Sequence, residues 1–200
     1  MTSRWKTWLP QKNRLAMLIL AGSFLIGWSN VSWAQSRTPG LTIFSGVKQT
    51  NELKYLIDGN QPGNRRARYY LGISGRKMQL AVSEFEVLYP KKFRGRFDPE
   101  RVEVRLGKGR ARKGQRVASE VVWDPNNACG LSLPGTEDEY CRIEIYLDQS
   151  IPANTGVVLV FDRVKNPNMP GTHYFHGRVR TPGDQPFRSY VGTWIVQAGL

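Results

Sequence analysis

Histidine and cysteine, the residues that most often hold transition metals, are scarce in this chain, with two of each among 200 residues. The histidines, His173 and His176, lie three positions apart, which on a strand places them on opposite faces, so that they cannot chelate one metal unless the strand has a bulge. The sequence also has no Gly-x-Ser-x-Gly elbow, no Cys–His pair and no phosphate-cradling loop. We therefore predict no catalytic residue, no metal site and no cofactor.

Acidic residues are also few, with 16 Asp and Glu against 29 Lys and Arg, which gives a net charge of +13. The one dense acidic cluster is Glu137-Asp138-Glu139. Paired carboxylates can bind calcium or act as acid and base. A solvated acidic turn is the favoured interpretation, and an ion site is the alternative.

A long apolar run is missing as well. The run at residues 15–28 follows four basic residues and is interrupted by glycine and serine, whereas a membrane-spanning helix needs about 20 apolar residues. This order, followed by the small residues Ser32 and Ala34, is typical of a secretion signal. We predict that residues 1–34 are a cleavable signal peptide, that residues 35–40 form a loose arm, and that no transmembrane anchor remains after processing. An uncleaved membrane anchor is the alternative.

Both cysteines, Cys129 and Cys141, follow the predicted cleavage point. Exported proteins meet oxidising conditions that favour pairing, and two cysteines without a neighbouring histidine make a poor metal-ligand set. We predict one disulfide bond, which should stabilise the fold by about 3 kcal/mol.

The exported part reads as a series of short strands separated by Pro- and Gly-containing turns, which is the pattern of a sandwich or barrel. Its 166 residues are enough for one core. We predict an all-β protein with a single β-sandwich over residues 41–200, for which immunoglobulin-like layering is one possible form. The eight strand candidates are 68–74, 78–89, 101–106, 117–123, 142–147, 157–161, 172–180 and 189–197.

Three segments carry more specific expectations. In the strand at 78–89 the apolar positions change parity, which requires a bulge or break near Ser83-Glu84. The run at 157–161 is apolar throughout and predicts a central strand covered on both sides. Leu53, Leu56 and Ile57 have helical spacing, so a helix of at most two turns is expected at 50–57.

Most of the positive charge lies in one stretch, residues 91–116, which holds eleven Lys and Arg side chains and three acidic ones. Such a patch attracts polyanions with a strong dependence on salt. A solvated, solubilising loop is an equally weighted interpretation. The anion-binding candidates are Lys108, Arg110, Arg112, Lys113 and Arg116.

Export disfavours nucleic acid as the partner of this patch. The anionic surfaces that remain are lipid headgroups, acidic polysaccharide, peptidoglycan and an acidic protein face. Phe93 and Phe97 lie among the cations and would suit a membrane interface, although core packing at a strand end is the favoured interpretation.

The strand at 172–180 is expected to alternate between core and solvent. Phe175 and Val179 should point inward, and His176, Arg178 and Arg180 should point outward with Tyr174. On this basis Arg178→Ala should have little effect on stability.

Four motifs recur in an order that resembles a family of exported cyanobacterial proteins classified as a domain of unknown function. They are Tyr69-Tyr70-Leu71-Gly72-Ile73, Asn166-Pro167, Gly171-Thr172-His173-Tyr174-Phe175 and Tyr190-Val191-Gly192-Thr193-Trp194. The resemblance spans about residues 41–197. It implies export in a cyanobacterium, to the periplasm or thylakoid lumen, and it implies no activity.

Together these features predict a non-enzymatic envelope or lumenal protein, in the periplasm, the thylakoid lumen or outside the cell, that binds an anionic partner through its basic patch. The alternatives are an accessory subunit of a membrane-associated complex and, third, a hydrolase built around the acidic cluster or His176.

Overall fold

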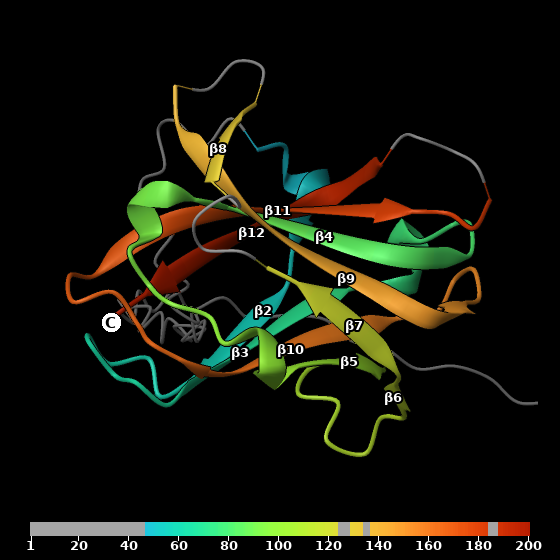
Figure 1. Ribbon diagram of the computed structural model, residues 1–200, viewed down its shortest axis with the longest axis horizontal. Helices are drawn as coiled ribbons and strands as arrows, with labels where there is room; N and C mark the ends of the chain where they lie inside the picture. Colours follow the sequence, from blue (N-terminus) through green and yellow to red (C-terminus); the bar gives the residue numbers. More distant parts are fainter. Residues whose placement is uncertain (1–46, 124–128, 134–136, 184–187) are drawn as a thin grey trace, which may run out of the picture. The chain divides into compact units, whose positions relative to one another are not determined.

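A computed structural model describes residues 47–123, 129–133, 137–183 and 188–200, which form two β-sheets packed face to face (Figure 1). The first sheet has the order β1 (Glu52–Leu53), β12 (Ser189–Ala198), β11 (Gly171–Arg180), β4 (Val82–Pro90), β9 (Glu139–Ile151) and β7 (Ser119–Val122), and β8 (Cys129–Ser132) also pairs with β9. The second has the order β2 (Tyr55–Asp58), β3 (Ala67–Ile73), β10 (Val157–Val164), β5 (Val102–Leu106) and β6 (Arg116–Val117). The predicted signal peptide and arm lie outside the described residues.

The core fills the space between the sheets, where alternate residues of each strand meet. Phe85, Phe175 and Trp194 of the first sheet and Leu71 and Phe161 of the second are all fully buried. β10 lies between β3 and β5, so the run at 157–161 is a central strand as predicted. The predicted all-β sandwich is confirmed.

The change of parity within β4 has the cause that the sequence predicted, a bulge near Ser83-Glu84. The pairing of β4 with β9 shifts register between Val82 and Glu84, after which Phe85 and Val87 face the core. The bulge therefore turns Glu84 and Glu86 to the outer face of the sheet.

The helix expected at 50–57 is wrong. A short 3₁₀ turn, η1 (Gln49–Asn51), leads directly into β1 and β2. β1 pairs with β12, and β2 pairs with β3. A helix of two turns is marginal alone in water, and pairing with two established sheets outweighs its apolar spacing.

The strand expected at 117–123 is divided between the sheets. β6 pairs with β5 in the second sheet, whereas β7 pairs with β9 in the first. The chain therefore crosses from one layer to the other at this edge. No helix within the described ranges is long and apolar enough to span a membrane.

Candidate functional site

Residues 107–115 form the loop between β5 and β6, which we call the basic loop. It lies at the lower right of Figure 1. Its backbone is held by its own hydrogen bonds: Gly114 N–H donates to Ala111 O (2.9 Å), and Ala111 N–H donates to Lys108 O (3.1 Å). Gly107 N–H donates to Gly156 O (2.8 Å), which ties the loop to the turn before β10. The loop is therefore a folded element of the sandwich.

Ala111 anchors the loop to the outer face of the second sheet. Its side chain packs against Tyr70, Val158 and Val160. Its φ of 42° lies in the left-handed region, which costs an alanine about 1–2 kcal/mol. Such strain persists only where the surroundings enforce it, so the packing and hydrogen bonds of this loop outweigh the cost.

Arg110 provides a second anchor. Its Nη2 and Nε donate to the Asp58 carboxylate at 2.6 and 3.1 Å, and its guanidinium lies 5.9 Å from the centre of the Tyr70 ring. Tyr70 donates its hydroxyl to the same carboxylate at 3.1 Å. The hydrogen bond from Arg110 holds the pKa of Asp58 below its usual value. Arg110 is therefore a structural anchor more than a free anion-binding group.

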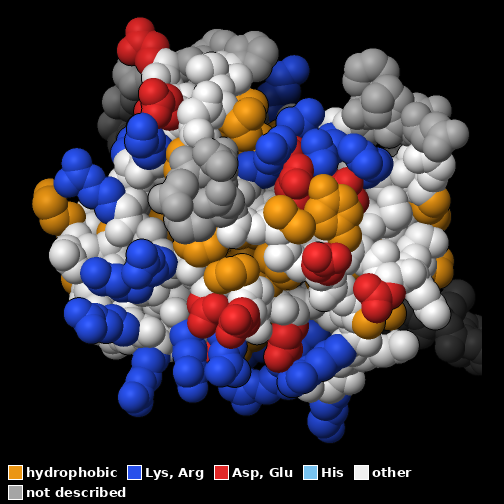
Figure 2. Space-filling view, viewed as in Figure 1, with side chains coloured by type: hydrophobic (Ala, Val, Ile, Leu, Met, Phe, Trp, Pro, Cys, Tyr) orange, Lys and Arg blue, Asp and Glu red, His pale blue; other side chains and the backbone are white. Residues whose placement is uncertain are grey.

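The five predicted anion-binding residues thus divide into two groups. Arg110 pairs with Asp58, and Arg116 lies 3.4 Å from Glu103. Lys108, Arg112 and Lys113 are exposed, and within the described part of the chain none of the three forms an ion pair. Lys and Arg side chains line the lower margin of the molecule in Figure 2, where this loop lies. The free charge of the loop resides in these three cations.

The first cations of the 91–116 run serve a different purpose. Lys91 Nζ lies 2.7 Å from Glu139 Oε2, and Lys92 Nζ lies 2.7 Å from Asp138 Oδ2. Two carboxylates of the acidic cluster are thus paired with lysines from η3 (Lys91–Phe93). Across the described segments, no group of three His, Cys, Asp or Glu could hold a metal ion.

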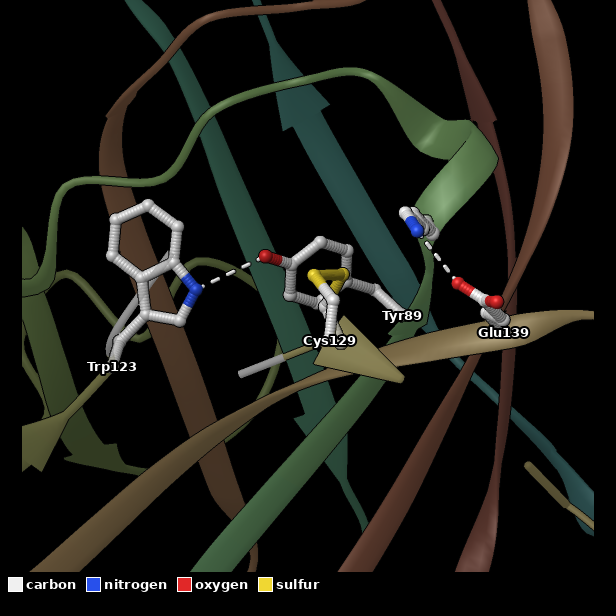
Figure 3. The surroundings of a disulfide bond; sticks show 6 residues. Tyr89, Trp123, Cys129 and Glu139 are labelled. Carbon is white, nitrogen blue, oxygen red and sulfur yellow. Dashed lines mark hydrogen bonds and ion pairs between the residues drawn. A yellow bond between two sulfur atoms is a disulfide. The ribbon is translucent and has the colours of Figure 1, made fainter. Parts of the chain in front are cut away.

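Figure 3 shows the disulfide between Cys129 and Cys141, which confirms the predicted pair. The bond joins β8 to β9. Beside it, Trp123 Nε1 donates to the Tyr89 hydroxyl at 3.0 Å.

Phe93 and Phe97 are buried in the core, at 0% and 3% exposure. They stack on one another with ring centroids 5.5 Å apart. Core packing, the favoured interpretation, is confirmed, and insertion of these rings into a membrane interface is excluded.

The two histidines lie on opposite faces of β11, as their spacing requires. His173 is buried against Phe93, and neither ring nitrogen has a hydrogen-bond partner among the residues that the structure describes. His176 is half-buried on the outer face, where its Nδ1 lies 2.7 Å from Thr193 Oγ1 and its Nε2 lies 3.3 Å from the Tyr140 hydroxyl. Burial lowers the pKa of both rings. Among the described residues no carboxylate contacts His176, so the residues of the hydrolase alternative do not converge.

The outer face of the first sheet carries an ionic network that the sequence did not reveal. Glu84 and Glu86 of β4 are each only 2% exposed although they face outward. Arg178 Nη1 lies 3.1 Å from Glu86 Oε2, and Arg180 Nε lies 3.3 Å from Glu84 Oε2. Arg188 contacts Glu84, Glu86 and Glu144, and Arg142 contacts Glu86 and Glu144. Figure 2 shows the interleaved acidic and basic side chains over this part of the sheet.

Strand register explains this network. Arg178 is the cross-strand partner of Glu86, and Arg180 is the partner of Glu84. Opposite charges directly across a strand pair stabilise it. The arginine side chains cover the glutamates and neutralise them, so this network is a structural element and not an open site.

Comparison with known proteins places the chain in a family. Residues 41–198 match the family model described as "Protein of unknown function (DUF2808)". The chain belongs to the DUF2808 family. The resemblance to a family classified as a domain of unknown function is thereby confirmed. The matched range includes all the described residues of the β-sandwich except the last two.

Some solved structures are similar to the DUF2808 domain. The collagen-binding domain of a Staphylococcus aureus adhesin matches with a TM-score of 0.39 and 9% identity, over 72% of this chain and 95% of that one. The collagen-binding subdomain of the Enterococcus faecalis surface protein ACE matches with a TM-score of 0.39 and 8% identity, over the same shares. These values carry no inference about function. No curated protein sequence matches the chain.

Proposed function

We propose that this protein is a non-enzymatic, exported binding protein that holds an acidic polysaccharide of the cell envelope through Lys108, Arg112 and Lys113. The observation that carries the proposal is the folded basic loop. A purely solubilising loop needs no fixed conformation, whereas this loop keeps Ala111 at a φ of 42° and presents three exposed cations that form no ion pair among the described residues.

The burial of Phe93 and Phe97 favours a polysaccharide over a membrane. With these rings in the core, the basic stretch has no aromatic side chain to insert into an interface, and stable membrane binding usually needs apolar insertion in addition to charge. A polyanion in contact with exposed cations requires charge alone. Lipid headgroups, peptidoglycan and an acidic protein face are the competing partners.

The test is retention of the full chain on immobilised polygalacturonate, with neutral dextran and vesicles containing an anionic lipid as the other arms. The Debye length shortens from about 10 Å at 0.1 M salt to about 3 Å at 1 M. We expect retention on polygalacturonate at 0.1 M salt and release at 1 M. Binding to the vesicles without binding to polygalacturonate would contradict the choice of partner. Binding to neither the vesicles nor polygalacturonate would contradict the proposal as a whole.

The export component rests on the basic, apolar and small-residue order of residues 1–34. A cyanobacterial envelope or lumen is the location that the motif order favours. N-terminal sequencing of the protein from its native cells should begin at Gln35. A full-length species in the cytoplasm would contradict export.

A further inference from the structure

A hollow of about 320 Å³ opens on the sandwich away from the basic loop. The residues that border it come from three segments. Trp123 follows β7, and Arg163 and Lys165 lie in β10 and directly after it. The third segment is 96–99, which leads into η4 (Pro99–Arg101). Lys and Arg side chains gather on the left of the face shown in Figure 2, where the segment from η3 to η4 runs in Figure 1.

Two of its cations are held opposite one another. Arg96 and Lys165 form an isolated antiparallel bridge in which each N–H donates to the carbonyl of the other, at 3.0 and 2.9 Å. Gly95 permits this approach, because a Cβ atom there would lie 2.9 Å from Lys165 O and closer still to the Phe93 ring. Directly opposed residues extend their side chains to the same side, and opposed like charges destabilise the pair.

A third cation is placed there by a strained bulge. The pairing of β10 with β3 shifts register between Phe161 and Val164, and Arg163 within this bulge has a φ of 53°. Bulges often direct a side chain beside a functional site, and a non-glycine residue in the left-handed region is strained. Within the described ranges, none of the three cations forms an ion pair with a distance of 4 Å or less, although the charge of Arg163 helps to lower the pKa of the neighbouring Asp162. Asp98 is the one acidic residue among those that border the hollow.

The remaining border of the hollow is aromatic, apart from Pro99 and the carboxylate Asp98. Trp123 is half-buried and is fixed by its hydrogen bond to the Tyr89 hydroxyl, while Phe97 forms part of the core beneath. Asp98 Oδ1 accepts the Glu100 N–H at 3.1 Å. An aromatic wall with a few converging polar groups is the usual form of a ligand pocket, and this volume lies near the lower end of the range of about 300–1,000 Å³.

We propose that this hollow binds a small sugar that carries a carboxylate or a phosphate group. The oxyanion would occupy the position between Arg96, Arg163 and Lys165, where it relieves the repulsion among them. The apolar face of the sugar ring would pack on Trp123, and a ring hydroxyl could donate to Asp98. This site is independent of the basic loop.

The test is calorimetric titration of the full chain with glucuronate and with glucose 6-phosphate at constant ionic strength, with glucose as the neutral control. We expect at least one of the two acids to bind and glucose to bind at least tenfold more weakly. Whichever acid binds identifies the oxyanion. Absence of binding by both acids at millimolar concentration, or equal binding of glucose, would overturn the proposal.

A matched pair of variants tests the role of the bulge. Arg163→Gly and Arg94→Gly each remove one cation and each relieve a positive φ, since Arg94 has a φ of 52°, but Arg94 does not border the hollow. Arg163→Gly should weaken binding at least tenfold with an unchanged or higher melting temperature, whereas Arg94→Gly should bind within twofold of the native protein. Arg96→Gln should also weaken binding tenfold. Native affinity in both Arg163→Gly and Arg96→Gln would overturn the proposal.

The basic-loop variant Lys108→Gln/Arg112→Gln/Lys113→Gln separates the two sites. It should lose retention on polygalacturonate and keep its affinity for the sugar acid. Parallel loss of both would contradict the independence of this site.

Discussion

Replacing Arg178 by alanine removes the closest partner of a nearly buried carboxylate. The distance from Arg178 Nη1 to Glu86 Oε2 is 3.1 Å, and Glu86 is 2% exposed. Its other arginine contacts, to Arg188 and Arg142, are longer at 3.7 and 3.8 Å. The sequence suggested that Arg178→Ala would matter little because its side chain faces outward, and the structure revises that expectation.

The magnitude has an upper and a lower bound. Breaking a fully buried ion pair costs about 3–5 kcal/mol, and an exposed pair contributes about 0–1 kcal/mol. The cost also has an upper limit, because Glu86 can take up a proton instead of staying charged without its partner. Protonation at pH 7 costs about 1.4 kcal/mol for each pH unit above the ordinary pKa of 4.5, which is roughly 2.5 units. Because Arg178 is 36% exposed and two arginines remain, we expect a loss of about 1–2 kcal/mol. That loss lowers the melting temperature by about 2–8 °C.

The loss should depend on pH. Burial raises the pKa of Glu86 despite the three arginines, so the folded state holds this proton more tightly than the unfolded state does. The stability that comes from this effect is fully present below pH 4.5 and is lost as pH rises through the folded-state pKa. At pH 4 Glu86 is mostly protonated and needs no cation, so Arg178→Ala should cost less than about 0.5 kcal/mol there.

The assay is thermal unfolding of the native protein, Arg178→Ala and Arg178→Lys at pH 4 and pH 7. Arg178→Lys keeps a positive charge at the position and should lose less than half as much as Arg178→Ala at pH 7. Arg65→Ala, which removes an exposed arginine outside the network, should have no effect at either pH. An equal loss for Arg178→Ala at both pH values would refute the argument from the buried carboxylate.

Three further outcomes are expected. Burial, and secondarily Lys92, lowers the pKa of His173, so the stability that the neutral ring provides is present above pH 6.5 and is lost as pH falls. The melting temperature of His173→Leu should therefore depend less on pH between 7 and 5 than that of the native protein. The same dependence in both proteins would contradict this. Val179 is 6% exposed, and Val179→Asp should destabilise the fold by about 3 kcal/mol or more in a denaturant melt, with a smaller loss showing that the position tolerates solvent. Reduction of Cys129–Cys141 should lower stability by about 3 kcal/mol, and an unchanged melting temperature would show that the bond contributes nothing.

Local pattern was sufficient for the central strands β4, β10 and β11, although it failed at β1 and β2, where a helix was expected. The parity change at Ser83-Glu84 located the bulge of β4, and the uninterrupted apolar run at 157–161 located the central strand β10. The alternation in β11 correctly placed Phe175 inside and Arg178 outside. These features depend on side-chain periodicity, which a single strand displays on its own.

Partners from distant segments were beyond the reach of the sequence. Glu84 and Glu86 alternate with Phe85 and Val87 as any solvent-facing carboxylates would, and only the pairing of β4 with β11 shows that arginines cover them. In the same way, Asp58 gives no sign that it will bind Arg110, 52 residues away. A net charge of +8 over residues 91–116 therefore overstated the free charge of that region.

The pairing of Arg110 with Asp58 also decides which side chains the basic-loop variant should change. Removing Arg110 would break its hydrogen bonds to Asp58 and could disturb the loop itself. The informative variant retains Arg110 and changes only Lys108, Arg112 and Lys113 to glutamine. Its matched control, Lys54→Gln/Arg65→Gln/Arg66→Gln, removes the same charge from exposed positions outside the loop.

Retention of these two variants on immobilised polygalacturonate at 0.1 M salt tests the proposed function most directly. The loop variant should elute with the unbound protein while its melting temperature stays within about 2 °C of the native value, because exposed charges contribute little to folding. The control variant should be retained like the native protein. Equal retention of the two variants would show that binding follows net charge alone, and it would contradict the assignment of the basic loop as the binding site.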